Sequence, residues 1–276
     1  MSHEDSDNWD PQFHGRSPLF APLASMVAQH FSQLRDWPGL ADFNRVFTEQ
    51  PVMNAQGLNI HCVSQAAKSS SFAEAYEPRI YHQGELQTRL ANWHDFFNFL
   101  VWQHFPKTKA LLNAKQVQAL SYRHQNAISE RSIAEHVLTM FDECGAIFVS
   151  SDADQLDLLK DFGWWQLFWH NRKRFAVDTA AFIFGHGIFE KAINPYVGLT
   201  AKAVLLRVDQ DFFQTDSRQQ LAYLDVRLVA HFQQAEAVAH TKVLQPLPIL
   251  GIPGWYPENE DELFYRNTDY FRVRTC

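Results

Sequence analysis

The chain has 276 residues, of which 46% are hydrophobic, 14% aromatic and 20% charged, and its formal net charge is −7. This composition is typical of a protein with a large core and excludes a disordered chain, while the acidic balance argues against broad binding to nucleic acid. The acidic start of the chain lacks the order of a secretory signal and no apolar run approaches the ~20 residues of a membrane span, so we expect a cytoplasmic protein without nucleic-acid or membrane partners.

The first third of the chain predicts short helices and little sheet. Residues 1–17 are polar and show little periodicity, so we expect a mobile leader there. Helical spacing over residues 18–49, interrupted once by a Trp-Pro-Gly turn, predicts two helices. A short strand is expected at residues 58–63, and residues 76–81 are interpreted as extended chain that Gly84 closes.

The strongest predicted helix covers about residues 88–105 and contains the stretch Asn92–Trp102, which is apolar around its whole circumference. A helix that is apolar on every side is usually buried. His94, Asp95 and Asn98 then lie inside the protein, where an unpaired polar group costs roughly 2–7 kcal/mol, so each needs a fixed partner. We therefore expect a buried polar network around this helix, which is either a functional site or a part of the core.

The middle of the chain predicts a second long helix and a hairpin. Pro106 suits the first position of a helix that ends near Gln125. Two apolar runs, at residues 137–141 and 146–149, flank an Asp-Glu-Cys-Gly turn and predict a β-hairpin. The segment 150–175 is helical in spacing, with Ser151 or Asp152 as its N-cap.

The last third predicts a further apolar helix at about residues 179–193, a strand at 201–208, an amphipathic helix at 216–236 and an irregular tail from about residue 246. No linker divides the chain, so residues 18–276 are expected to form one globular domain. The predicted fold class is α+β and helix-dominated, with the central buried helix of about residues 88–105 and a small antiparallel sheet.

The second apolar helix carries His186 and Glu190 four residues apart, on one face, as His94 and Asn98 are on the central helix. Two facing helices that each present a histidine and an oxygen-bearing side chain can hold a divalent metal. The predicted metal ligands are His94, His186 and Glu190. The alternative is that His186 only satisfies a buried carboxylate, with the glycines on both sides of it allowing close approach.

Asp142 and Glu143 fall in the predicted hairpin turn, where acidic residues are common for turn chemistry alone. They are also able to supply a general base or ligands to a hard metal ion. The three cysteines, Cys62, Cys144 and Cys276, lack metal-ligand spacing and are odd in number, which argues against a disulfide scaffold and a structural zinc site.

A cationic group surrounds the start of the helix at Pro106. A helix N-terminus exposes free N–H groups, so Lys107 and Lys109, joined by Arg79 and Arg89, predict a site for a phosphate or carboxylate. The alternative is that these are ordinary surface residues, and Lys109 in particular is taken as a surface lysine.

A series of motifs resembles a bacterial family catalogued as domain of unknown function 3025. The matching stretches cover roughly residues 20–272 and include Tyr76–Tyr81, Asn92–Asn98, Phe105–Lys109, Leu138–Glu143, Phe184–His186 and Leu250–Trp255. The resemblance implies a single bacterial domain and supplies no substrate, cofactor or catalytic residue. Glu135-His136 stands where the family pattern has Arg-Asp, so no role of that Arg or Asp is carried over.

Two functions remain open on the sequence. The first is a metal-assisted or acid–base hydrolase that acts on a small anionic substrate, such as a phosphorylated one. In it His94 and His186 bind a metal or transfer protons, while Asp95 and Glu190 orient or ligate. The second is a non-catalytic binding or interaction protein, in which the same polar groups tie two core helices together. Histidines that share a solvent-accessible cavity favour the enzyme, whereas a separation above about 12 Å, several times hydrogen-bond reach, excludes a shared site.

Overall fold

The structure is a computed structural model that describes residues 8–65 and 71–273. Its α-helices are α1 (Ala24–His30), α2 (Leu40–Glu49), α3 (Tyr76–Gln83), α4 (Trp93–His104), α5 (Pro106–Gln125), α6 (Ile133–Cys144), α7 (Ala153–Lys160), α8 (Arg172–Asp178), α9 (His186–Ala192) and α10 (Ser217–Gln233). Its strands are β1 (His61–Ser64), β2 (Glu85–Thr88), β3 (Gly145–Ser150), β4 (Thr179–Ile183), β5 (Thr200–Arg207) and β6 (Gln245–Pro248). The predicted helix-dominated α+β class is confirmed.

The larger sheet has four strands in the order β4-β3-β5-β6. β3 pairs antiparallel with β4 and parallel with β5, and β5 pairs antiparallel with β6, so the sheet is mixed where a purely antiparallel one was predicted. β1 and β2 form a separate parallel pair. Every residue of β3 is buried, as expected for a strand with neighbours on both sides and helices on its faces.

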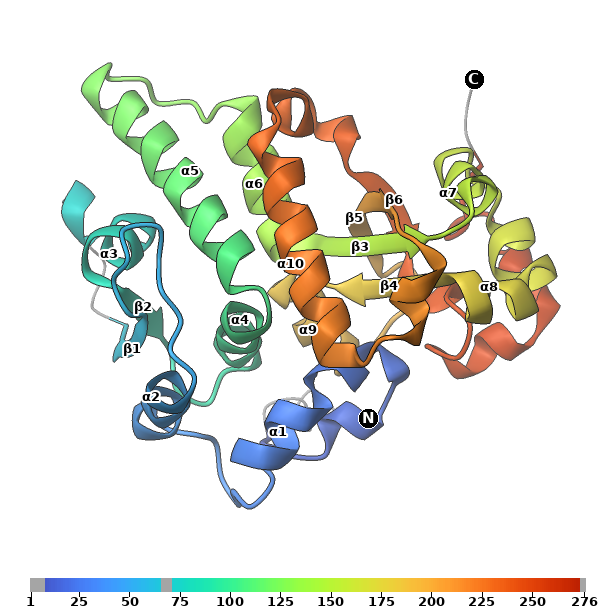
Figure 1. The fold of residues 1–276 in the computed structure, drawn as a ribbon, viewed down its shortest axis with the longest axis horizontal. Helices are drawn as coiled ribbons and strands as arrows, with labels where there is room; N and C mark the ends of the chain where they lie inside the picture. The colour runs from blue at the N-terminus through green and yellow to red at the C-terminus, as the bar shows by residue number, and fades with distance from the viewer. Residues whose placement is uncertain (1–7, 66–70, 274–276) are drawn as a thin grey trace.

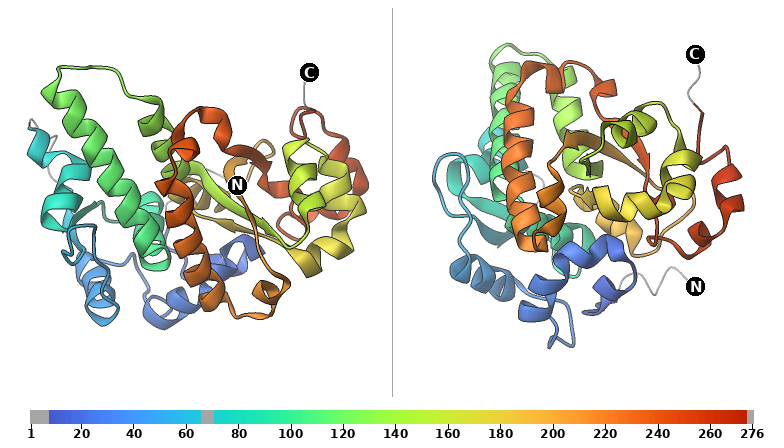
Figure 2. Two further views of the ribbon diagram at one scale, coloured as in Figure 1. Left: turned by 45° about the horizontal axis from the view of Figure 1, so that its top comes forward. Right: turned by 45° about the vertical axis from the view of Figure 1, so that its right-hand side comes forward.

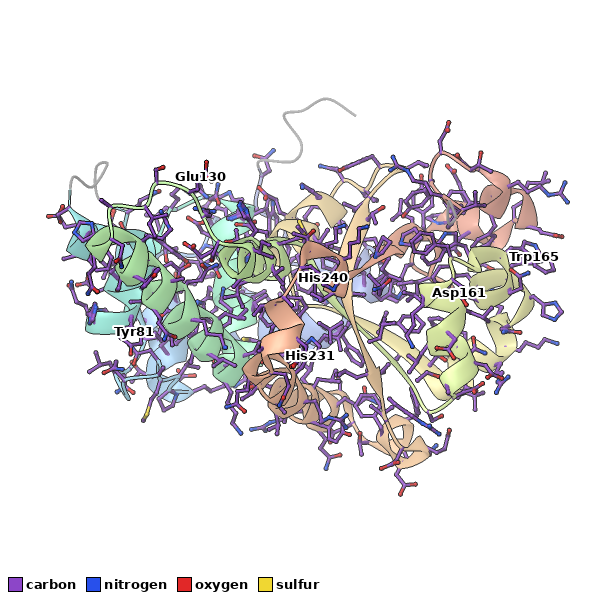
Figure 3. The ribbon with its side chains drawn as sticks, turned by 90° about the horizontal axis from the view of Figure 1, so that it is seen from above. Tyr81, Glu130, Asp161, Trp165, His231 and His240 are labelled. Carbon is purple, nitrogen blue, oxygen red and sulfur yellow. The ribbon has the colours of Figure 1, made fainter. Side chains whose placement is uncertain are left out.

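The helices α3 and α5 lie at one end of the molecule with α4 beside them, the larger sheet lies in the middle, and α7 and α8 lie at the other end (Figure 1). Figure 3 marks the two ends by Tyr81 and Glu130 on one side and by Asp161 and Trp165 on the other. α5 and α10 run side by side in both views of Figure 2 and are in contact. Within the described residues, every helix is too short or too polar to cross a membrane.

Helix α4 forms the core as predicted, with eight of its residues buried between Trp93 and Trp102. It begins later than predicted because β2 takes up residues 85–88, and the Asn92 side chain caps it by accepting from the Asp95 N–H. Part of the predicted leader also belongs to this core. Phe13 is fully buried and packs against Trp93, and Trp9 stacks on the same ring. Residues 8–17 are therefore held by apolar contacts, and residues 1–7 lie outside the described part of the chain.

The predicted hairpin over residues 137–149 is wrong. Its first half belongs to α6, and β3 follows without a loop. The decisive signal is a capping box, in which the Ser132 side chain accepts from the Glu135 N–H and the Glu135 carboxylate accepts from the Ser132 N–H. This cap starts a helix whose last turn contains Asp142 and Glu143.

Two further segments differ from the prediction. Residues 76–81 are helical and belong to α3, which Gly84 ends with a positive φ of 71°. The predicted helix at 179–193 divides into strand β4 and helix α9, because the β-rich run at 179–183 pairs with β3. In the short apolar run at 179–183, local periodicity did not distinguish a buried strand from a buried helix.

The other elements lie close to their predicted positions. α5 begins at Pro106, β5 covers the predicted strand, α10 covers most of the predicted amphipathic helix, and Asp152 caps α7. The segment predicted as one helix from 150 to 175 consists of α7, a π-helical turn at Trp165–His170 and the start of α8. The tail contributes β6 and otherwise forms short 3-10 turns.

The N-terminus of α5 is fixed by an internal carboxylate. The buried side chain of Asp225 in α10 accepts from the Lys107 N–H at 3.0 Å and from the Thr108 N–H at 2.8 Å. The Thr108 hydroxyl also donates to it, at 2.7 Å. The carboxylate charge meets the positive end of the helix dipole, so this contact locks α5 against α10.

We predict that Asp225→Ala lowers the free energy of unfolding by about 2–3 kcal/mol, because two N–H groups and a hydroxyl lose a buried acceptor. The control is Asp216→Ala, which removes the solvent-exposed N-cap of α10 and is expected to cost about 1 kcal/mol. Urea denaturation measures both. Equal losses of stability in the two variants would contradict a special role for the buried contact.

Candidate metal centre in a polar cavity

The antiparallel pairing of β3 with β4 brings Glu143 and His186 together. Ala146 pairs with Ile183, so the start of β3 lies opposite the end of β4. Glu143 is in the last turn of α6, just before β3, and His186 begins α9, just after β4. The two residues therefore lie at the same end of the sheet, although they are far apart in the sequence.

Glycines allow this close approach. A Cβ atom at Gly185 would lie 2.5 Å from the Glu143 carbonyl oxygen and 2.4 Å from the Gly145 nitrogen. A Cβ atom at Gly187 would lie 3.0 Å from the same carbonyl oxygen. Any larger residue at Gly185 would push α9 away from the end of α6, and His186 with it. The glycines beside His186 are predicted to allow close approach of another element, and that element is the end of α6.

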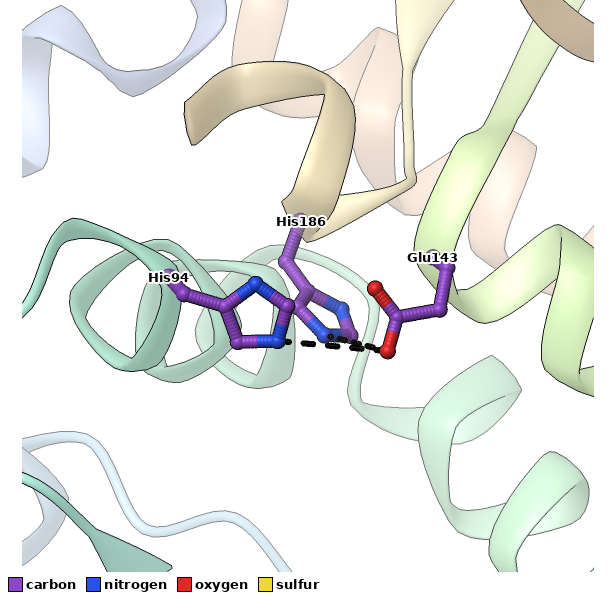
Figure 4. Close-up of side chains that lie close together, drawn as sticks. All are labelled: His94, Glu143 and His186. Carbon is purple, nitrogen blue, oxygen red and sulfur yellow. Dashed lines mark ion pairs between the residues drawn. The ribbon is translucent and has the colours of Figure 1, made fainter. Parts of the chain in front are cut away.

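His94 joins the pair from α4, which packs against α9. The rings of His94 and His186 have centroids 4.4 Å apart and lie nearly perpendicular. Figure 4 shows both rings directed toward the Glu143 carboxylate. The prediction that the two histidines lie close together is confirmed.

Three potential ligand atoms converge here. One donor atom each from His94, Glu143 and His186 lies within 4.8 Å of the other two. Glu143 Oε1 is 3.5 Å from His186 Nε2 and 3.9 Å from His94 Nε2. Ligands of a tetrahedral zinc ion, at about 2.0–2.2 Å from it, are ~3.4 Å apart. Small side-chain movements would therefore suffice to bind an ion.

Carboxylates also lie behind both imidazole rings. His94 Nδ1 donates to Glu190 Oε2 at 2.9 Å, which leaves Nε2 directed at Glu143. His186 Nδ1 is buried without a hydrogen-bond partner, and Asp142 Oδ2 lies 4.0 Å from it. Metal-binding histidines usually have such a partner on the nitrogen remote from the metal.

The electrostatics match this arrangement. The hydrogen bond to Glu190 raises the pKa of His94, with the charge of Glu143 adding to the effect. The pKa of the Glu143 carboxyl is lowered to about 2, chiefly by the His186 imidazole beside it. Glu143 is therefore a carboxylate across the physiological range, as a metal ligand has to be.

The cluster opens into a cavity of about 370 Å³. The side chains of His94 and Glu143 are 25% and 42% exposed, whereas that of His186 is 5% exposed. The cavity is lined by α3, α4, α5 and α6 as well as by β2 and α9. Water and a small molecule therefore have a path to both histidines, and a shared accessible cavity is the arrangement that favours an enzyme over a binding protein.

Lys109 is part of this cavity and not of the surface. It is only 4% exposed, and its ammonium donates to Asp142 Oδ1 at 2.6 Å and to Asn98 Oδ1 at 2.9 Å. Asn98 in turn donates to the Tyr76 hydroxyl at 2.7 Å. The polar network expected around α4 exists, with Lys109 at its centre, because the start of α5 turns this side chain back toward α4.

A second polar pair lies on the cavity wall, formed by Glu77 of α3 and Asn113 of α5. Asn113 Nδ2 donates to the Glu77 carboxylate at 2.6 Å and to the Glu77 carbonyl at 3.0 Å. Burial raises the pKa of the Glu77 carboxyl to about 7. Neither residue is among the predicted site residues, because residues 76–81 are predicted to be extended and the sequence gives no sign that α3 packs against α5.

The predicted anion site is already filled by the chain's own carboxylates. Arg79 pairs with Glu85, and Arg89 pairs with Asp95. Lys109 pairs with Asp142, and the free N–H groups at the start of α5 bind Asp225. The Lys107 side chain is exposed and does not line the cavity. Of the four predicted cations, Arg89 and Lys109 line the cavity, each paired with a carboxylate, whereas Arg79 and Lys107 do not line it.

The predicted catalytic residues are therefore only partly brought together. His94, His186 and Glu190 meet, but Glu190 contacts the outer nitrogen of His94, and Glu143 takes the place predicted for it. Asp95 lines the same cavity, but its carboxylate is not part of the cluster, because it accepts from the backbone N–H and the guanidinium of Arg89. Glu143 had been noted as a potential metal ligand, but the wrong hairpin separated it from the histidines.

Comparison with known proteins gives a family and nothing more. The model of a family described as "Protein of unknown function (DUF3025)" matches residues 60–275. No curated protein and no solved structure matches the chain.

We predict that Glu190→Gln lowers the pKa of His94 in the metal-free protein, because the variant removes the charge that favours the imidazolium. Since the pKa is raised in the folded state, the pair stabilises the fold below pH ~6.5 and this contribution is lost as pH rises through the raised value. Proton NMR titration of the imidazole measures the shift, with Glu236→Gln at an exposed turn as the control. An unchanged His94 titration in Glu190→Gln would contradict the assigned contact.

Proposed function

The chain belongs to the DUF3025 family, and we propose that its cavity is the active site of a metal-assisted hydrolase in which His94, His186 and Glu143 hold a divalent ion. The observation that carries the proposal is the convergence of these three donor groups at the wall of an accessible cavity. A ligand set of two imidazoles and one carboxylate is typical of catalytic zinc sites, which keep one position open for water or substrate.

The chemistry follows from that open position. A bound divalent ion lowers the pKa of a coordinated water to about 7 and polarises a carbonyl oxygen. Glu190 holds the His94 ring so that Nε2 is directed to the ligand set. Asp142 Oδ2 lies 4.0 Å from the outer nitrogen of His186, and a small side-chain movement would make it the carboxylate partner of that nitrogen.

Lys109 is placed to act on the substrate. Its ammonium has three donors, and Asn98 and Asp142 account for two hydrogen bonds. The third N–H would donate to negative charge that develops on a substrate oxygen during hydrolysis. The ammonium also lies over the Trp102 ring, 5.4 Å from its centre. Asp142 and Asn98 hold this ammonium in place, so the transition state does not have to order a flexible side chain.

The anionic substrate expected from the sequence loses its support, since the cations assigned to it pair with Glu85, Asp95, Asp142 and Asp225 or, for the Lys107 side chain, lie outside the cavity. We propose instead a small polar substrate with a carboxylic ester or amide bond. The second function, a non-catalytic binding protein, is favoured by the same internal pairing, because paired groups also serve as a polar core. Metal-dependent turnover separates the two functions.

We predict zinc-dependent hydrolysis of 4-nitrophenyl acetate or of an acyl 4-nitroanilide, and loss of turnover after chelation. His94→Ala, His186→Ala and Glu143→Ala should each lower kcat/KM by about 100-fold or more, and Glu190→Gln by about 10–100-fold, as for a partner of a metal ligand. His240→Ala, at an exposed position labelled in Figure 3, should leave it unchanged.

The assay is run with zinc, manganese, cobalt and iron(II), each added to chelated protein. Turnover that survives chelation, or that is unchanged in the ligand variants, would contradict the proposal. Tight metal binding without turnover of any ester, anilide or 4-nitrophenyl phosphate would favour the non-catalytic alternative.

A further inference from the structure

The carboxylates that line the cavity do not all form ion pairs with cationic side chains. Two of them have cationic partners, since Asp95 pairs with Arg89 and Asp142 pairs with Lys109. A third, Glu143, faces the histidines. The remaining carboxylate is that of Glu77, with which no Lys or Arg of residues 8–65 and 71–273 forms an ion pair. Among the described residues, Glu77 is therefore the carboxylate of the wall without a direct cationic partner.

A second acceptor lies beside it. Asn113 is only 3% exposed, and its Nδ2 donates two hydrogen bonds, both to Glu77. Those two contacts fix the orientation of the amide, because only the NH₂ end donates. Asn113 Oδ1 is buried and has no hydrogen-bond partner. A buried acceptor without a donor is unfavourable, so this oxygen is suited to a donor that arrives with a ligand.

We propose that Glu77 and Asn113 form a subsite for an ammonium group of the substrate, on the wall of the same cavity as the metal centre. This inference rests on the proposed function and names its substrate class, a small amide or ester that also carries a primary amine. An ammonium has only donors, and the subsite offers a carboxylate and an amide oxygen. Ile80 and Leu112 line the same cavity and suit an alkyl part.

The state of Glu77 agrees with this assignment. Its pKa is raised to about 7, chiefly by burial and then by the charge of Asp142, although the hydrogen bond from Asn113 and the more remote charges of Lys109 and Arg131 lower it. The ionised form is thus disfavoured as long as no cation lies beside it. A bound ammonium would stabilise that form, and an anionic group would be repelled by it.

The probes are straight-chain hydroxamates of two to six carbons, which bind zinc through the hydroxamate, each with and without a terminal amine. The series makes the test independent of the spacing between the metal and Glu77. In the zinc-loaded protein, at least one amino compound should bind about 10–100-fold more tightly than its desamino partner, the usual effect of a hydrogen bond to a charged group. Calorimetry measures the affinities.

The isosteric variant Glu77→Gln should remove most of this preference and leave the affinity for the desamino compounds unchanged. Glu236→Gln is the matched control on the exposed surface and should keep the preference. Equal affinities of amino and desamino compounds at every chain length in the wild-type protein would overturn the subsite and leave the metal centre intact. Failure of every hydroxamate to bind would contradict the metal centre, and the subsite with it.

Discussion

Helix α4 has to satisfy polar side chains inside an apolar core, and the rest of the site follows from this constraint. Most of the helix is buried, yet His94 and Asn98 lie on it. His94 forms a hydrogen bond with Glu190 of α9, and Asn98 accepts one from Lys109 of α5. A buried polar group without such a partner would cost several kcal/mol. These contacts therefore favour the packing of α9 and α5 on α4, and the polar cavity lies beside these helices.

The sheet and the Asp225 contact supply the remaining geometry. The antiparallel register of β3 and β4 brings the end of α6 to the start of α9, and Gly185 lets the two backbones touch. Asp225 fixes the start of α5 at Lys107 and Thr108, and the next residue, Lys109, directs its side chain into the cavity. Each element is held by a contact that also positions a group of the site, so stability and function share the same residues.

The features that depend on local chemistry could be predicted from the sequence. The start of α5 at Pro106, the burial of α4 and the approach of His94 to His186 follow from backbone restriction and from the need of buried polar groups for partners. The stretches that carry the family resemblance supply all three proposed ligands. Glu143 was not placed because a run of β-branched and aromatic residues outweighed the capping box of α6. Asp225 and Lys109 were beyond reach, since their partners are determined only by tertiary packing.

The central claim is that the three side chains form one metal centre. The most direct measurement is anomalous diffraction at the zinc edge from crystals of the zinc-loaded protein. The account predicts a single strong peak about 2.0–2.2 Å from His94 Nε2, His186 Nε2 and a Glu143 carboxylate oxygen, with a fourth position open to the cavity. An absent peak, or an ion bound by Glu190 or other residues while Glu143 stays uncoordinated, would contradict it.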